Sequence, residues 1–181
     1  EPMIALAEEA IAVARRAGDD KAVVDTLIRI QESVVVPETL AQRVAWIDEA
    51  CAIADRLDDR VLRTMAYTYK HLNAIEQADL GWVRKGLEVV EAEAAHIGQL
   101  TYRWIAAIER STERALAGDI VEAELEAGRA FQLGAEGGQP DAAGAFGMQV
   151  LTLRWMQGRL SEVVPLIAQT LDAVPGVAAM R

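Results

Sequence analysis

The fold of this chain is decided by the stretch Arg114-Ala115-Leu116-Ala117-Gly118-Asp119-Ile120-Val121-Glu122-Ala123. Its helix-favouring residues are interrupted once, at Gly118-Asp119, which predicts that one helix ends and the next begins there. Forty residues later the pattern returns as Arg154-Trp155-Met156-Gln157-Gly158-Arg159-Leu160-Ser161-Glu162-Val163. The recurrence indicates repeated helix–turn–helix units.

Further positions keep the same 40-residue spacing without an insertion. The apolar columns are Leu40, Leu80, Ile120 and Leu160, then Ala7, Ile47, Leu87, Ala127 and Ile167, then Ala10, Ala50, Val90, Ala130 and Thr170. A column of small residues contains Ala14, Ala54, Ala94 and Gly134, followed by Val174, and a turn column contains Gly18, Asp58, Gly98 and Gly138. Because stacked helices approach closely only where side chains are small, the small column predicts helix contacts. The spacing predicts about four and a half repeats of two helices each.

The periodicity and the turns predict helices over residues 3–17, 21–33, 39–57, 61–77, 80–97, 101–117, 120–135, 141–157 and 161–173. Pro37 separates the first helix pair, because a residue that precedes proline is pushed out of the helical region. Pro165 predicts a late start or a kink in the last helix.

Composition narrows the class of protein. The chain has 181 residues, of which 33 are alanine and one is cysteine, and its net charge is −10. The single cysteine excludes a disulfide-stapled module, and the acidity argues against direct nucleic-acid contact by this segment. No apolar run is long enough for a membrane span. We expect an all-α protein with one domain over residues 1–181, located in the cytoplasm and away from the membrane.

The segment Gly118-Asp119-Ile120-Val121-Glu122-Ala123 resembles the turn and second helix of a tetratricopeptide (TPR) repeat. The sequence pattern of residues 101–171 resembles the C-terminal helical arrays of large bacterial STAND/AAA-ATPase signalling regulators, which carry LuxR-type DNA-binding or nucleotide-cyclase domains. The resemblance implies a right-handed superhelix of antiparallel helix pairs that senses a signal or binds a partner. It also implies that the chain is part of a longer protein. No residue matches the ATPase, cyclase or DNA-binding parts.

No arrangement of residues predicts catalysis, a metal site or a cofactor. His71 and His96 lie in different repeats and have no metal-ligand spacing. His96 is expected to cap a helix near Gly98, and Cys51 is expected to be buried and inert. The tryptophans and Tyr69 are interpreted as core residues at helical spacing, with a pocket lined by Tyr69, Trp104 and Trp155 as the alternative.

The charges divide between the two sets of helices. Basic residues outnumber acidic ones on the helices over 61–77, 101–117 and 141–157, whereas acids dominate the intervening helices. The candidate binding residues are therefore Arg63, Lys70, Arg103, Arg110, Arg114 and Arg154. One hypothesis is a basic groove for an acidic protein or peptide partner, or for a small effector that controls an attached domain. The alternative is that these cations pair with acids on adjacent helices.

Overall fold

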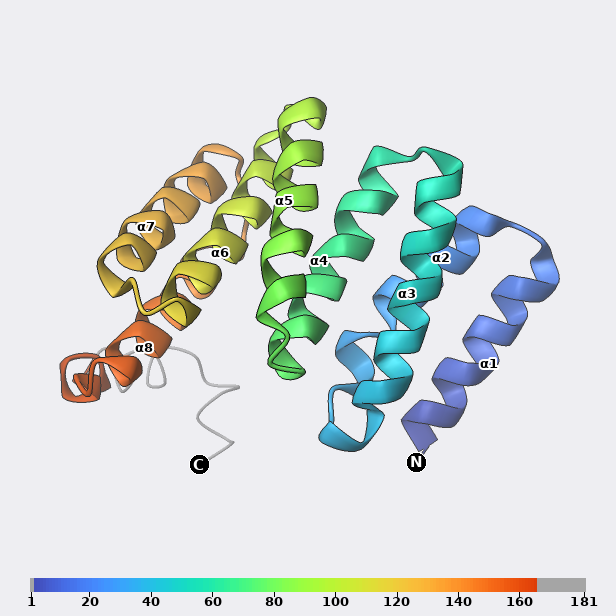
Figure 1. Ribbon diagram of the computed structural model, residues 1–181, viewed down its shortest axis with the longest axis horizontal. Helices are drawn as coiled ribbons and strands as arrows, with labels where there is room; N and C mark the ends of the chain where they lie inside the picture. The colour runs from blue at the N-terminus through green and yellow to red at the C-terminus, as the bar shows by residue number, and fades with distance from the viewer. Residues whose placement is uncertain (1, 166–181) are drawn as a thin grey trace. The chain divides into compact units, whose positions relative to one another are not determined.

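The computed structural model describes residues 2–165, and within this range every regular element is helical (Figure 1). The α-helices are α1 (Pro2–Ala17), α2 (Asp20–Arg29), α3 (Leu40–Leu57), α4 (Arg60–Glu76), α5 (Leu80–Ile97), α6 (Leu100–Leu116), α7 (Ile120–Glu136) and α8 (Ala142–Met156). Three short 3-10 helices are η1 (Glu32–Val34), η2 (Pro37–Thr39) and η3 (Leu160–Glu162). The predicted all-α class is confirmed for the described residues.

Left-handed backbone conformations end the helices at regular intervals. Positive φ angles, from +51° to +82°, occur at Gly18, Asp58, Ala78, Gly98, Gly118, Gly138 and Gly158. A residue in this conformation satisfies the last carbonyls of a helix and stops it. At four of these turns the next residue is an aspartate whose side chain accepts backbone N–H groups of the following helix, namely Asp19, Asp59, Asp79 and Asp119. The same two-residue signal therefore closes one helix and opens the next.

Ala78 is strained in this conformation because it carries a Cβ atom where most equivalent turns have glycine. We expect Ala78→Gly to raise the free energy of unfolding by about 0.5–1 kcal/mol. Glycine relieves the backbone strain of the folded state, and the greater conformational entropy of glycine in the unfolded chain offsets part of that gain. Gly98→Ala should lower the free energy of unfolding by about 1 kcal/mol through backbone strain alone, since a Cβ at Gly98 would meet no atom within 4 Å. Urea denaturation measures both changes, and equal stabilities of Ala78→Gly and the unmodified chain would contradict the expectation.

The predicted helix over residues 21–33 was too long. α2 ends at Arg29, and η1 and η2 fill the segment before α3. Pro37 holds Val36 in an extended conformation, with φ −140° and ψ 152°, which no helix can contain. The buried hydroxyl of Thr39 then donates to the carbonyl oxygens of Val34 and Val36, so the irregular backbone remains hydrogen-bonded.

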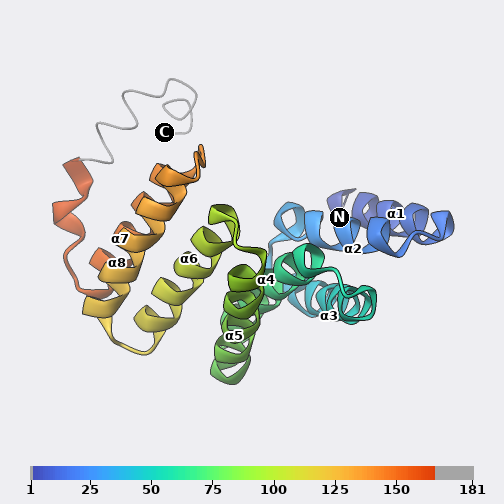
Figure 2. The ribbon, with the colours of Figure 1, turned by 90° about the horizontal axis from the view of Figure 1, so that it is seen from above.

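The chain forms two compact units, Glu1–Glu109 and Arg110–Arg181, and α6 passes from one into the other. In the first unit, α1 to α5 follow one another as packing neighbours, and α4 packs most extensively against α5 (Figures 1 and 2). In the second unit, α7 packs against α8, with Ala123, Ala127 and Leu153 buried between them. The prediction of a single domain stays a prediction.

Two of the predicted columns are buried wherever the structure describes their residues. The small residues Ala14, Ala54, Ala94 and Gly134 are buried, as are Ala7, Ile47, Leu87 and Ala127. The column that starts helices is different, because Leu80 and Leu160 are exposed. A residue at a helix start precedes the first full turn and contacts fewer neighbours.

The last predicted helix, over residues 161–173, lies mostly outside the described residues. η3 and a turn at Val163 precede helical backbone at Val164 and Pro165, as the proline predicted. Among residues 2–165, no helix combines the length and the apolar character needed to cross a membrane.

Candidate functional site

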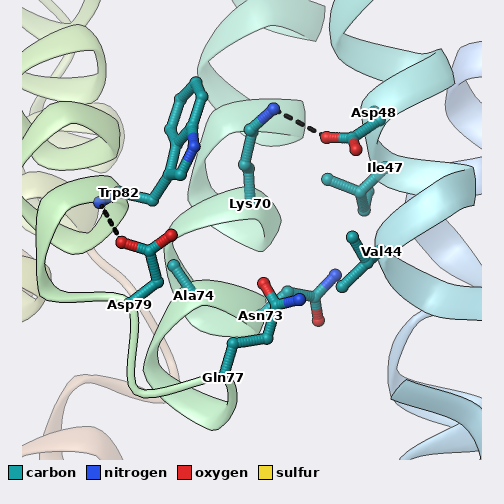
Figure 3. A pocket seen from close by; sticks show the side chains of 9 residues that line it. All are labelled: Val44, Ile47, Asp48, Lys70, Asn73, Ala74, Gln77, Asp79 and Trp82. Atoms are coloured by element: carbon teal, nitrogen blue, oxygen red, sulfur yellow. Dashed lines mark hydrogen bonds and ion pairs between the residues drawn. The ribbon is translucent and has the colours of Figure 1, made fainter. Parts of the chain in front are cut away.

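A hollow of about 320 Å³ lies in the first unit between α3, α4 and the start of α5 (Figure 3). Its lining residues are Val44, Ile47, Asp48, Lys70, Asn73, Ala74, Gln77, Asp79 and Trp82. Helical spacing explains how they meet: Lys70, Asn73 and Ala74 of α4 and its C-cap residue Gln77 follow one another at i, i+3, i+4 and i+7, which places them on one face. The turn at Ala78 then brings Asp79 and Trp82 to the same hollow.

Lys70 forms the charged centre of this hollow. Its ammonium group lies 2.6 Å from Oδ1 of Asp48 on α3. The same nitrogen lies 4.0 Å from the centre of the Trp82 ring, and Nζ of Lys85 lies 4.5 Å from that ring. An ammonium group over an indole face is attracted by the negative face of the ring. The indole of Trp82 therefore contacts two cations, and of these Lys70 lines the hollow.

Asp79 fixes the position of Trp82. Its Oδ1 accepts a hydrogen bond from the backbone N–H of Trp82 at 3.0 Å, which caps α5 (Figure 3). This bond fixes the backbone of Trp82 at the start of α5. Asp79 also lines the hollow, where its carboxylate is the second one beside that of Asp48.

Asn73 belongs both to the hollow and to a buried polar network. The guanidinium of Arg43, only 2% exposed, donates to Oδ1 of Asn73 at 2.9 Å and makes a two-pronged ion pair with Glu76. Asn73 in turn donates to the side-chain oxygen of Gln31. These bonds join α3 and α4 to Gln31 in the irregular segment after α2, so one wall of the hollow is held by a hydrogen-bond network.

A second hollow of about 300 Å³ shares Asn73 with the first. It is lined by Gln31, Glu32, Val35, Arg43, Tyr69, Leu72, Asn73, Ile75 and Glu76. The Tyr69 hydroxyl donates to Oε1 of Glu32 at 2.7 Å, and burial is the main cause that raises the pKa of Tyr69. The carboxylates of the second hollow, Glu32 and Glu76, already accept hydrogen bonds from Tyr69 and Arg43. The first hollow is therefore the better candidate for a ligand.

The six predicted binding residues divide between the two units. Arg63, Lys70 and Arg103 lie in the first, whereas Arg110, Arg114 and Arg154 lie in the second. Of the six, only Lys70 lines a described hollow. Arg103 is exposed, and Arg110 and Arg114 are partly buried on α6.

Ion pairs to adjacent helices occupy several of these cations. Arg63 bridges Asp55 of α3 and Glu93 of α5, both at 2.9 Å. Arg154 binds Glu124 of α7 and lies 3.5 Å from Glu162. Nε of Arg114 is 3.8 Å from the neighbouring Glu113. Arg63, Lys70 and Arg154 therefore all have the interhelix pairs that the alternative interpretation predicted, and the groove hypothesis stays a prediction.

Sequence reasoning missed most of the hollow. Trp82 was interpreted as a core residue, but it is only partly buried and stacks under Lys70. Trp155, also assigned to the core, is 67% exposed, whereas Trp46 is buried as predicted. The available signal was Asp79 after the Ala78 turn, since a capping aspartate fixes where the residue three positions later lies.

Cys51 is buried, as predicted, and burial raises the pKa of its thiol to about 12. Nδ1 of His96 donates a hydrogen bond to the carbonyl oxygen of Ala92 at 2.7 Å in the last turn of α5. His71 is fully buried, and its Nδ1 lies 2.9 Å from the carbonyl oxygen of Val83. Within the described part of the chain, no cluster of three or more histidine, cysteine or acidic residues could hold a metal ion.

Glu109 is a second unusual titratable group. It lies on α6, is 3% exposed, and its two carboxylate oxygens make no hydrogen bond of normal geometry with the described residues. Burial is the main cause that raises its pKa to about 8. The nearby Thr68 hydroxyl acts in the opposite direction, and the negative charge of Glu91 adds to the increase. Glu109 is thus a carboxyl group that the fold favours in its neutral form.

Comparison with known proteins finds no matching protein family, curated protein or solved structure.

Proposed function

We propose that this chain is a non-catalytic, TPR-like interaction module of a larger cytoplasmic regulator. In this proposal its helix pairs form a right-handed superhelix with a 40-residue repeat, similar to the arrays of STAND signalling proteins. Support comes from the left-handed turns at Gly18, Asp58, Gly98 and Gly138, which lie 40 residues apart. The starts of α3, α5 and α7 at Leu40, Leu80 and Ile120 have the same spacing.

The partner we propose is an acidic segment of another protein, bound at the hollow beside Lys70. One observation carries this proposal: the ammonium group of Lys70 lies over the Trp82 ring in the lining of a cavity of about 320 Å³. A carboxylate that enters there would meet the ammonium group of Lys70, and its aliphatic portion would contact the indole.

Asp48 makes the proposed site selective. It already pairs with Lys70, so an incoming carboxylate must compete with Asp48 for the ammonium group. The chain also carries a net charge of −10, which repels acidic chains at long range. Binding should therefore require a carboxylate placed at this hollow, and general charge attraction would not suffice.

A small effector is a second candidate, favoured by the size of the hollow. Its volume of about 320 Å³ lies at the lower end of the range for small-molecule sites. The side-chain amide of Gln77 and the ion pair of Lys70 with Asp48 could hold a ligand that has both a donor and an acceptor.

Titration calorimetry with acetylated hexaglutamate tests the proposal at low ionic strength. We expect Lys70→Gln to weaken binding about tenfold or more, because a hydrogen bond to a charged group is lost. Lys85→Gln should weaken it less, since Lys85 is exposed. Added salt should weaken binding by the unmodified chain.

Lys21→Gln is the matched control. Lys21 is the only other lysine, and it pairs with Asp59 at 2.8 Å outside the hollow. Equal losses for Lys21→Gln and Lys70→Gln would show general charge attraction and contradict the proposed site. Tighter binding of hexalysine than of hexaglutamate would exclude an acidic partner.

A further inference from the structure

α1 has two apolar faces, and only one of them is covered. Ala7 and Ile11 are buried in the core of the first unit, at 6% and 2% exposure. Leu6 and Val13 point elsewhere and are 67% and 51% exposed. The exposed pair is seven residues apart, which places both side chains on one stripe of the helix.

The equivalent stripe of α3 shows what such a face contacts. It runs through Gln42, Trp46, Glu49, Ile53 and Arg56, at helical spacing. Its polar members bind the preceding hairpin formed by α1 and α2: Gln42 donates to Glu8 at 2.8 Å, Glu49 pairs with Arg15 at 2.6 Å, and Arg56 pairs with Asp20 at 2.7 Å. Its apolar members, Trp46 and Ile53, are buried.

Forty residues earlier, α1 carries the same chemistry in the same order. Leu6, Glu9, Val13 and Arg16 stand where α3 has Trp46, Glu49, Ile53 and Arg56. All four α1 residues are exposed, and neither Glu9 nor Arg16 forms an ion pair within residues 2–165. We call these four residues the α1 stripe. It repeats the apolar–acidic–apolar–basic pattern that α3 uses for contact with a helical hairpin.

We propose that the α1 stripe binds a helical hairpin of a partner protein. The partner's first helix would carry an arginine opposite Glu9, and its second helix would begin with an acid opposite Arg16. Arg15 and Asp20 present this arrangement to α3 in the chain itself. Burial of Leu6 and Val13 would supply most of the affinity, and the two ion pairs would set the register.

A chain with residues 1–40 duplicated ahead of Glu1 tests this inference, because the 40-residue register continues through the junction. The added hairpin then presents its own Arg15 and Asp20 to the original Glu9 and Arg16. Hydrogen exchange read by mass spectrometry reports how often the added hairpin opens. We expect protection comparable to that of α1 and α2 in the unmodified chain.

Substitutions in the original copy identify the surface used. Leu6→Asp should increase the opening equilibrium of the added hairpin about tenfold or more, through loss of apolar burial. Glu9→Arg should increase the opening equilibrium of the added hairpin about two- to fivefold, the range expected for an exposed ion pair. Arg15→Glu in the added hairpin should then restore protection, because the two charges are exchanged. The same substitutions without the added hairpin should leave the melting temperature unchanged, since both side chains are exposed.

Two results would overturn the inference. The first is an added hairpin whose amides show no protection from hydrogen exchange, or whose protection does not change with Leu6→Asp. The other is a dimer of the unmodified chain in sedimentation equilibrium that Leu6→Asp abolishes, because the stripe would then serve a second copy of this chain.

Discussion

Between pH 5 and pH 9 the unmodified chain should lose on the order of 3–5 kcal/mol of unfolding free energy through Glu109, and Glu109→Gln should remove this loss. The pKa of Glu109 is raised to about 8 in the folded chain, from an ordinary value of 4.5. The folded state therefore binds the proton more tightly than the unfolded state does. This stabilisation is fully present below pH 4.5 and disappears as the pH rises through about 8.

Urea denaturation at several pH values measures this effect. Glu109→Gln keeps the size of the side chain and cannot ionise, so its stability should vary less with pH than that of the unmodified chain. Glu88→Gln is the matched control, because Glu88 is an exposed glutamate on the neighbouring α5. Parallel pH profiles for the unmodified chain and Glu109→Gln would show that burial does not hold this carboxyl group neutral.

Arg43→Met should produce the second large effect, a loss of about 2–4 kcal/mol of unfolding free energy. Breaking a buried ion pair costs about 3–5 kcal/mol. The expected loss is smaller here because the Glu76 side chain is 37% exposed and stays partly hydrated. Without the guanidinium, the amide oxygen of Asn73 loses its donor inside the core. The pair of Arg43 with Glu76 also joins α3 to α4, so its loss should loosen the wall of the hollow.

A double-mutant cycle separates this ion pair from the rest of the network. Glu76→Gln and Arg43→Met together should cost less than the sum of the two single changes. Arg43 lowers the pKa of Glu76, so the contribution of the pair is present above the ordinary glutamate pKa of 4.5 and is lost as the pH falls through the lowered value. Additive single changes, or an Arg43→Met variant as stable as the unmodified chain, would contradict this role.

The site was predictable from the sequence only in part. Lys70 was predicted as a binding residue because it belongs to the set of helices on which basic residues outnumber acidic ones. Trp82 was interpreted as a core residue, because periodicity indicates which face of a helix is apolar and not which neighbouring helix lies against that face. Arg43 reads as an ordinary surface charge, and only its contacts with Asn73 and Glu76 show that it is buried.

Among the described residues, the sequence by itself determined where the helices lie and most of their limits, the end of α2 being the exception. The turn signals act through local backbone geometry: a residue such as Gly118 adopts a left-handed conformation and the next residue, Asp119, caps the following helix. These interactions span a few residues, so their pattern is visible in the chain. The tertiary structure decided which charges pair, that Lys70 meets Trp82, and that Glu109 is buried. Those outcomes depend on distances between helices that are far apart in the sequence, and burial changes the energy of a charge only once those helices have packed.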